Sequence, residues 1–238
     1  MRAPVSHLPL VATQLRYAAG GVAILHGLDL AIEAGPPLVI LGPNGAGKSV
    51  LLRLLHGLIV PTGGNVTWSG EPGRPRGAMV FQRPVMLRRS VLANAAYPLK
   101  LAGQPRAARH AAAMAALDRV GLAGLATRAA RRLSGGEQQR LALARAEATG
   151  PEVVFLDEPC ASLDPAAARA VEAIIAGIAG RGAKVVMTTH DLAQARRLAG
   201  EIAFLHRGRL LEQAPAATFF SAPSTPEAAA FLRGELLA

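Results

Sequence analysis

The sequence has one cysteine, few aromatic side chains and no long apolar run. Cys160 stands alone among 238 residues, so it forms neither an intrachain disulfide nor a multi-cysteine metal site, which agrees with a reducing compartment. A transmembrane helix needs ~18 or more successive apolar residues, and charge, proline or glycine interrupts every apolar run earlier. The amino terminus contains Pro4 and Pro9 and lacks the apolar core of a secretory signal. We therefore expect a protein inside the cell that does not span a membrane.

Acidic residues are also scarce, and the chain carries 26 Lys and Arg against 16 Asp and Glu, a net charge of +10. Such an excess is typical of nucleic-acid binding, of contact with an anionic membrane, or of a solvated basic exterior. No run of five or six basic residues occurs, and 4% aromatic residues offer little stacking surface. The solvated exterior is the favoured interpretation, with no specific nucleic-acid partner. Hydrophobic residues make up 51%, which excludes disorder as the main state.

Strand patterns alternate with helix patterns along most of the chain, which predicts βα units, a mainly parallel sheet and an α/β fold. From about 90 to 150 the composition shifts to Ala, Leu and Arg at helical spacing, which predicts a helical insert. The expected strands are 10–17, 24–32, 37–41, 66–68, 78–81, 153–156, 184–189 and 202–205. The expected helices are 49–58, 107–120, 135–149, 165–179, 192–198 and 226–237.

A phosphate-binding loop follows one of the buried strands. The segment 42–49, Gly-Pro-Asn-Gly-Ala-Gly-Lys-Ser, matches G-x-x-x-x-G-K-[ST] and lies between the apolar run 38–41 and the helix pattern. Its glycines allow the backbone N–H groups to curl around a phosphate at the positive end of the helix dipole. Lys48 would contact the β- and γ-phosphates, and Ser49 would offer a hydroxyl to Mg²⁺. The sequence therefore predicts nucleotide binding.

Two carboxylates end a second buried strand. Asp157 and Glu158 follow the apolar run 153–156, which places Asp157 at the carboxyl edge of the sheet, where ligands bind in such folds. Asp157 is predicted to hold Mg²⁺. Adjacent side chains of a strand point to opposite faces, so Glu158 has room for a different role. We expect Glu158 to polarise the attacking water as a general base.

The segment 133–140, Leu-Ser-Gly-Gly-Glu-Gln-Gln-Arg, resembles the signature sequence of ATP-binding cassette (ABC) ATPases. Ser134 is predicted to cap a helix that starts near Gly136. The N–H groups of Gly135 and Gly136 would form an anion site at the positive end of that helix. The resemblance implies that this anion site serves the nucleotide of a second copy of the chain, in a head-to-tail homodimer.

The other cassette motifs occur in the order of the family, and the resemblance covers nearly the whole chain. Tyr17 lies where the family stacks an aromatic ring on adenine, and Gln82 matches the Q-loop, which senses the γ-phosphate. Ser162-Leu-Asp164 resembles the D-loop, and His190 resembles the switch histidine that bonds the γ-phosphate.

The resemblance implies ATP and Mg²⁺ as cofactors and a P-loop NTPase (RecA-like) core with an N-terminal antiparallel β subdomain and an inserted α-helical signature subdomain. One ABC domain would span 1–238, with 1–88 and 151–238 as the core with its β subdomain and 89–150 as the helical subdomain. The implied catalytic residues are Glu158, His190, Gln82 and Lys48, and the implied metal ligands are Ser49, Gln82 and Asp157. The implied nucleotide contacts are Tyr17, Gly42, Pro43, Asn44, Gly45, Ala46, Gly47, Lys48, Ser49, Val50, Ser134, Gly135, Gly136 and Asp164. Two departures from the family, Val50 and Cys160, remove no catalytic group.

A single cassette without membrane helices is similar to the ATPase subunit of a bacterial-type transporter. This implies separate permease subunits, an indirect substrate-binding protein and a place on the cytoplasmic face of the plasma membrane. Segments 81–91, 189–197 and 231–236 resemble importers of oxyanions, tungstate first, then molybdate or phosphate. The apolar residues Val85, Met86, Leu87 and Val91 either form an exposed groove for the permease or pack inside the insert. An exporter ATPase and a nucleic-acid or ribosome-associated ABC ATPase remain as alternative functions.

Overall fold

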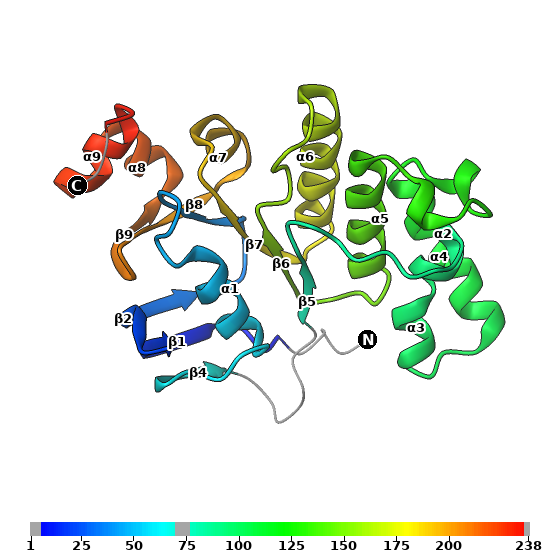
Figure 1. Ribbon diagram of the computed structural model, residues 1–238, viewed down its shortest axis with the longest axis horizontal. Coiled ribbons are helices and arrows are strands. Elements are labelled where there is room, and N and C mark those ends of the chain that lie inside the picture. The colour runs from blue at the N-terminus through cyan, green and yellow to red at the C-terminus, as the bar shows by residue number, and fades with distance from the viewer. Residues whose placement is uncertain (1–5, 70–76, 236–238) are drawn as a thin grey trace. The chain divides into compact units, whose positions relative to one another are not determined.

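The computed structural model describes residues 6–69 and 77–235 (Figure 1). Within these ranges the chain divides into two compact units. Unit 1 contains the described residues 6–69 and 184–235, and unit 2 contains 77–183. No helix within the described ranges combines the length and the apolar character that crossing a bilayer requires.

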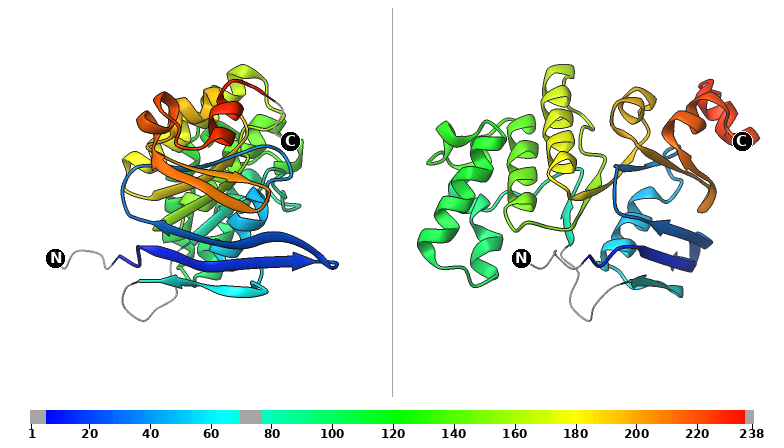
Figure 2. Two further views of the ribbon diagram at one scale, coloured as in Figure 1. Left: turned by 90° about the vertical axis from the view of Figure 1, so that its left-hand side faces the viewer. Right: turned by 180° about the vertical axis from the view of Figure 1, so that it is seen from behind.

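Unit 1 begins with a three-stranded antiparallel sheet of order β2-β1-β4, which Figure 2 shows as long extended strands near the N-terminus. Gly20 and Gly21 connect the first two strands in a two-residue turn, both with positive φ (56° and 80°). Such a turn matches the twist of the flanking strands. The strands are β1 (Leu10–Ala19), β2 (Val22–Ile32) and β4 (Gly63–Trp68).

The second part of unit 1 is a sheet segment of order β7-β3-β8-β9. The central strand β3 pairs in parallel with β7 and β8, and all four of its side chains are buried. Strand β9 runs antiparallel to β8 at the edge. These strands are β3 (Leu38–Leu41), β7 (Lys184–Thr189), β8 (Glu201–His206) and β9 (Arg209–Pro215). The helices of unit 1 are α1 (Lys48–His56), α7 (Leu192–Leu198), α8 (Ala216–Ser221) and α9 (Pro226–Leu232).

Helix α1 buries one apolar face, made by Leu51, Leu52, Leu54 and Leu55. It ends at Gly57, whose φ of 80° suits a left-handed C-cap and whose N–H donates to the Leu54 carbonyl at 3.0 Å. The helix therefore holds the segment before it firmly against the core of unit 1.

Unit 2 combines a parallel pair of strands with a group of packed helices. The buried side chain of Asn94, in helix α2 (Val91–Ala95), accepts from the Leu87 N–H at 3.0 Å and donates to the Ser90 carbonyl at 2.9 Å. These hydrogen bonds fix the loop before this helix. The strands are β5 (Gly77–Val80) and β6 (Val153–Asp157). The helices are α2 (Val91–Ala95), α3 (Tyr97–Leu101), α4 (Arg106–Arg119), α5 (Gly135–Glu147) and α6 (Pro165–Gly180), with 3-10 turns at Ala123–Leu125 and Ala130–Arg132.

The structure confirms the expected strands and helices to within a few residues at each end, except that the last helix ends at Leu232 and the final two residues of its expected range, 236–237, lie outside the described residues. It adds elements that the sequence patterns did not indicate: β9, α2, α3 and α8. The sequence left open whether the apolar residues of 85–91 form an exposed groove or pack inside the insert, and at two positions the structure favours packing, because Met86 is 6% exposed and Val91 is fully buried. Both side chains pack inside unit 2, whereas Val85 is 69% exposed. The limits 89 and 150 of the helical subdomain stay a prediction.

Candidate functional site

The loop 42–47 connects β3 to α1 in a conformation that depends on its glycines. Gly45 and Gly47 have φ values of 80° and 99°, in the left-handed region that favours glycine. A Cβ on Gly42 would lie 2.0 Å from the Leu205 carbonyl oxygen, and one on Gly47 would lie 2.9 Å from Leu25 Cδ2. The chain of unit 1 itself therefore requires glycine at these positions.

Lys48, the first residue of α1, is 5% exposed and reaches back over this loop. Its Nζ donates to the carbonyls of Gly42 at 2.9 Å and Pro43 at 3.0 Å. The Ala46 N–H donates to the Pro43 carbonyl at 3.3 Å, which closes the loop further. The carbonyl oxygens of Gly42 and Pro43 thus fix the Lys48 ammonium group beside the loop.

The N-cap of helix α1 is Gly47, which has no side chain to cap the N–H groups of the first turn. Backbone N–H groups at the positive end of a helix, together with an ammonium group, are the donor set that binds a polyphosphate. The residues present therefore fit the phosphates of ATP.

His190 and Tyr17 both lie beside the loop in unit 1. Leu41 and Thr189 are register partners in the parallel β3–β7 pair, so Gly42 and His190 leave the sheet at the same edge. The Thr189 hydroxyl accepts from the Asp191 N–H at 3.0 Å, and Asp191 caps α7, which fixes the backbone around His190. Tyr17, half-buried on β1, is the register partner of Leu25, the residue that approaches Gly47.

In unit 2, the predicted carboxylates and Gln82 share another strand edge. Val80 and Leu156 are register partners in the parallel β5–β6 pair, so Asp157 and the exposed Gln82 both follow the ends of these strands. Asp157 is 3% exposed. Glu158 is half-buried and has a φ of 43°, which is uncommon for a residue other than glycine.

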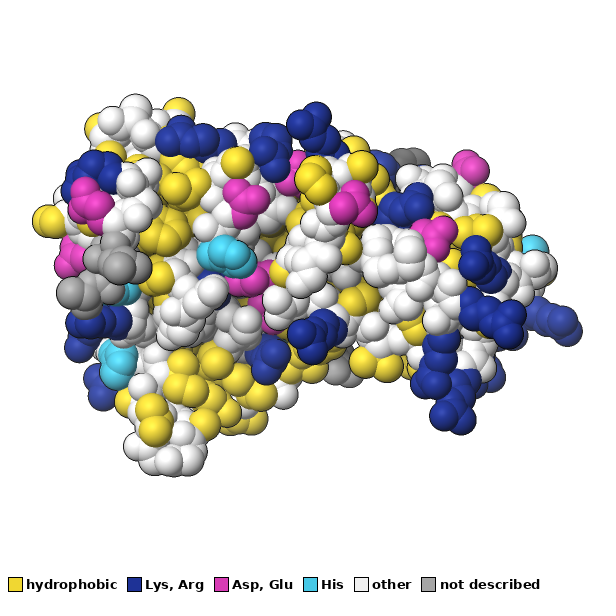
Figure 3. Space-filling view, turned by 45° about the horizontal axis from the view of Figure 1, so that its top comes forward, with side chains coloured by type: hydrophobic (Ala, Val, Ile, Leu, Met, Phe, Trp, Pro, Cys, Tyr) yellow, Lys and Arg dark blue, Asp and Glu magenta, His cyan; other side chains and the backbone are white. Residues whose placement is uncertain are grey.

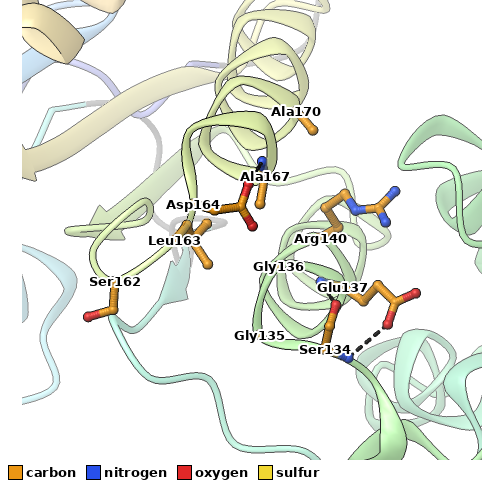
Figure 4. Close-up of a pocket in the computed structure, with 10 residues that line it drawn as sticks. All are labelled: Ser134, Gly135, Gly136, Glu137, Arg140, Ser162, Leu163, Asp164, Ala167 and Ala170. Atoms are coloured by element: carbon orange, nitrogen blue, oxygen red, sulfur yellow. Dashed lines mark hydrogen bonds between the residues drawn. The ribbon is translucent and has the colours of Figure 1, made fainter.

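The signature segment forms the N-terminus of α5 and confirms the predicted cap. Ser134 Oγ accepts from the Glu137 N–H at 3.3 Å, and the Glu137 carboxylate accepts from the Ser134 N–H at 2.7 Å, which completes a capping box (Figure 4). The Ser134 hydrogen bond holds the pKa of Glu137 below its usual value. Within the described residues, the N–H groups of Gly135 and Gly136 make no hydrogen bond.

A cavity of ≈ 360 Å³ lies between the start of α5 and the segment that leads into α6 (Figure 4). The structure thus brings the signature and D-loop segments of one chain together. The Asp164 carboxylate caps α6 by accepting from the Ala166 and Ala167 N–H groups, both at 2.9 Å. The lining residues are Ser134, Gly135, Gly136, Glu137, Arg140, Ser162, Leu163, Asp164, Ala167 and Ala170.

The two signature glycines differ in their surroundings. A Cβ on Gly136 would lie 2.9 Å from the Cβ of Ala167, so close packing of α5 on α6 requires this glycine. A Cβ on Gly135 would meet nothing within 4 Å, and its φ is not positive. Nothing in the described chain requires glycine at 135.

The sequence patterns missed Glu137 and Arg140 as residues of this cavity. The Arg140 guanidinium donates to the Val120 carbonyl at 2.9 Å and thereby ties α5 to the end of α4. The spacing of Ser134 and Glu137 is the capping-box signal and could have identified the glutamate. Arg140 offers no comparable signal, because its partner is distant in sequence.

No cluster of three or more His, Cys, Asp or Glu side chains that could hold a metal ion occurs in residues 6–69 and 77–235. Mg²⁺ at a nucleotide site uses one or two carboxylates together with the phosphates of the substrate. The buried carboxylate of Asp157 fits that chemistry, and Ser49 and Gln82 remain predicted as further oxygen donors.

The comparisons agree with this site. Residues 25–161 match the family model described as ABC transporter. The methionine import ATP-binding protein MetN of Caulobacter vibrioides is 37% identical over 230 residues, 91% of this chain and 69% of MetN. The tungstate uptake system ATP-binding protein TupC of Peptoclostridium acidaminophilum is 39% identical over 210 residues, 86% of this chain and 98% of TupC.

A phosphate import ATP-binding protein, PstB 2 of Natronomonas pharaonis, is 35% identical over 248 residues, 96% of this chain and 87% of PstB 2. The solved structure of cbiO1 from Clostridium perfringens, described as part of the ABC transporter complex cbiONQ, superposes with a TM-score of 0.80 at 25% identity, over 90% of each chain. It confirms the P-loop NTPase fold class. The chain belongs to the ABC transporter family as an ATPase domain that binds ATP, normally with Mg²⁺.

Proposed function

We propose that this chain is the ATP-hydrolysing subunit of an ABC importer, with Lys48 and the backbone N–H groups of 42–50 binding the phosphates and Tyr17 stacking on adenine. The observation that carries the proposal is the glycine-dependent loop over which Lys48 is held. Ser49, Gln82 and Asp157 are the proposed Mg²⁺ ligands. When bound, Mg²⁺ neutralises charge on the β- and γ-phosphates.

Glu158 is the proposed general base. Its carboxylate would accept a proton from water as the water oxygen attacks the γ-phosphorus and the bond to the β,γ-bridging oxygen breaks, giving ADP and phosphate. The left-handed backbone at Glu158 supports this role, because strained conformations cluster at functional sites. His190, at the same strand edge as the loop 42–47, would donate to the γ-phosphate.

The second part of the proposal is a head-to-tail homodimer in which Ser134, Gly135, Gly136 and Asp164 of one chain complete the site of the other. The open space around Gly135 supports it, because no group of the described chain occupies the place of a side chain there, and a phosphate held by a second chain would fit into it. The N–H groups at the start of α5 line the same cavity and are donors suited to a phosphate.

Mixing two inactive variants tests this dimer. Lys48→Ala removes the phosphate-binding ammonium, and Gly135→Asp places a carboxylate where a phosphate would bind. In a mixed head-to-tail dimer, one site combines the intact loop 42–49 of the Gly135→Asp chain with the intact signature of the Lys48→Ala chain. We expect the mixture to regain ATPase activity that neither variant has alone. If both residues serve one site within a chain, the mixture stays inactive.

The proposed transported substrate is an oxyanion, tungstate first, then molybdate or phosphate. The relatives that support it are the tungstate protein, of which this chain covers 98%, and the phosphate protein. The proposed partners are integral membrane permease subunits and, through them, a substrate-binding protein. The chain would lie on the cytoplasmic face of the plasma membrane, with 1–88 and 151–238 as its core and 89–150 as its helical subdomain.

ATPase measurements on the chain purified with its membrane partner test the import function. The substrate-binding protein is supplied, and tungstate, molybdate, sulfate, phosphate and methionine are added in turn. We expect tungstate to stimulate turnover above the other compounds. Stimulation by methionine alone would replace the oxyanion by an amino acid, and failure to retain any membrane partner would contradict the transporter role.

A further inference from the structure

Almost the whole net positive charge of the protein comes from one fifth of its sequence. Residues 83–132 contain ten basic residues and one acidic residue, a net charge of +9, whereas the full chain carries +10. Figure 3 shows the corresponding dark blue side chains gathered on the right of the view, over the helices α2 to α4. The remaining residues are nearly neutral as a group.

These basic side chains are largely without acidic partners in the part of the chain that the structure describes. Arg119 pairs with Glu147 at 3.2 Å, and Arg89 lies over the Tyr97 ring at 5.4 Å. The other eight form no salt bridge among residues 6–69 and 77–235, and most are exposed. They are Arg83, Arg88, Lys100, Arg106, Arg109, Arg128, Arg131 and Arg132.

Two exposed apolar side chains of this region have basic neighbours in the sequence: Val85, between Arg83 and Arg88, and Leu101. Leu101, at the end of α3, is 71% exposed. Lys100 precedes it, and Arg106 and Arg109 lie on the first turn of α4, across an exposed loop that contains Gly103 with a φ of 74°. We name Lys100, Leu101, Arg106 and Arg109 the basic tip. An apolar residue surrounded by basic residues is the composition of a segment that enters a membrane interface.

The composition of the basic tip distinguishes between possible anionic partners. Single-stranded nucleic acids need aromatic stacking platforms, and the basic tip contains none. The cytoplasmic loops of permeases carry an excess of Lys and Arg, so they would repel it. The cytoplasmic leaflet carries anionic lipids, which attract basic segments. Charge complementarity therefore favours the lipid surface.

We propose that the basic tip binds anionic lipid headgroups, with Leu101 entering the interface of the bilayer. This contact goes beyond the proposed function, because it requires neither ATP nor a permease. It would orient unit 2 against the membrane before a permease is engaged.

Sedimentation with lipid vesicles tests the proposal. The full chain is mixed with vesicles of phosphatidylcholine alone or with phosphatidylglycerol added, at low ionic strength and at about 0.15 M salt. We expect binding only to the anionic vesicles, weakened by salt. The variant Lys100→Gln, Arg106→Gln, Arg109→Gln should lower the partition coefficient on the order of 100-fold. Leu101→Ser should lower it about 5-fold, because an exposed apolar contact is lost.

Matched controls use residues of unit 1. The variant Arg16→Gln, Arg196→Gln, Arg209→Gln removes the same charge, and Val60→Ser, at a site that is 83% exposed, removes a similar apolar surface. Both should bind the anionic vesicles nearly as the unchanged chain does. The proposal would be overturned by an equal loss of vesicle binding in these controls, or by no binding to anionic vesicles at low ionic strength. It would also be overturned if the chain bound a single-stranded RNA more tightly than the vesicles and the basic-tip variant weakened RNA binding as much as vesicle binding. ATPase activity is measured in parallel, so loss of turnover with intact vesicle binding would count against the proposed function alone.

Discussion

The two loops aimed at phosphate, 42–47 and 134–136, differ in what makes glycine necessary. In the first, Gly42 faces the Leu205 carbonyl and Gly47 faces Leu25, so the same unit fills the space where a side chain would lie. In the second, only Gly136 has such a neighbour, and Gly135 faces open space beside the cavity. Neighbours within unit 1 require the glycines of the first loop, whereas no described neighbour requires Gly135 in the second.

This difference suggests how the two loops divide the work. A loop that its own unit holds in shape can bind nucleotide without a partner, since its N–H groups and the Lys48 ammonium are already positioned. In the proposed head-to-tail dimer, the N–H groups at the open Gly135 would act only when a second chain brings a phosphate to them. Binding and turnover should therefore respond to different substitutions.

The largest expected effect separates binding from turnover at Glu158. Glu158→Gln removes the proposed base while the loop 42–47 stays intact, so ATP affinity should be unchanged and kcat should fall about 10³-fold. Turnover assays and binding of a fluorescent ATP analogue measure the two quantities. Glu227→Gln, in the first turn of α9, is the matched control and should leave both unchanged. Normal turnover in Glu158→Gln would remove this residue from the role.

A pair of alanine substitutions tests the contrast between the signature glycines. Gly136→Ala forces its Cβ against Ala167 at 2.9 Å, so the free energy of unfolding should fall by about 1–3 kcal/mol. Gly135→Ala meets no neighbour, and alanine favours a helix, so stability should hold while kcat falls about 10-fold or more. Thermal unfolding and turnover distinguish the two. Full activity in Gly135→Ala would show that no partner group approaches that position.

Val85 and Met86 are adjacent in the sequence but differ in exposure, so a charge should affect permease contact at Val85 and stability at Met86. Val85 is 69% exposed, so Val85→Asp should keep the free energy of unfolding within about 0.5 kcal/mol and reduce substrate-stimulated ATPase of the assembled transporter. Met86 is 6% exposed, so Met86→Asp should destabilise the chain by about 2–5 kcal/mol. Unchanged stimulation in Val85→Asp would place the permease contact elsewhere.

Local patterns predicted most of the fold and the placement of the candidate residues. Glycine spacing, the apolar runs 38–41 and 153–156, and the cap at Ser134 act within a few residues, so the sequence alone predicts them. The sequence could not decide the exposure of 85–91, because helix packing distant in sequence covers Met86 and leaves Val85 open.

Strand β9 escaped prediction for a related reason. Its sequence, Arg-Leu-Leu-Glu-Gln-Ala-Pro, has no clear alternation and ends in proline, and its strand state comes from antiparallel pairing with β8. The basic tip was also only partly predictable from the sequence. The count of basic residues in 83–132 is available from the sequence, whereas the exposure of Leu101 beside them depends on how α3 meets α4.

The smallest expected effect concerns Glu137, which places a carboxylate beside the donors of the second loop. Its hydrogen bond from the Ser134 N–H lowers its pKa below the ordinary 4.5, so the group is ionised at neutral pH and repels a phosphate at the start of α5. Glu137→Gln keeps the pattern of the capping box and removes the charge, so the KM for ATP should fall about 3-fold. Gln138→Ala, which loses only a hydrogen bond to the Leu133 carbonyl, is the control.

The pH dependence of stability provides a second measurement on the same variant. Because the folded pKa of Glu137 is lowered, its carboxylate stabilises the protein above pH 4.5, and that contribution is lost as the pH falls through the folded value. The contribution should be only a few tenths of a kcal/mol, since solvent still reaches and screens this half-buried group. Glu137→Gln should therefore lose a small part of the acid sensitivity of unfolding. An unchanged KM for ATP together with an unchanged pH profile would show that the charge of Glu137 acts on neither the proposed phosphate site nor α5.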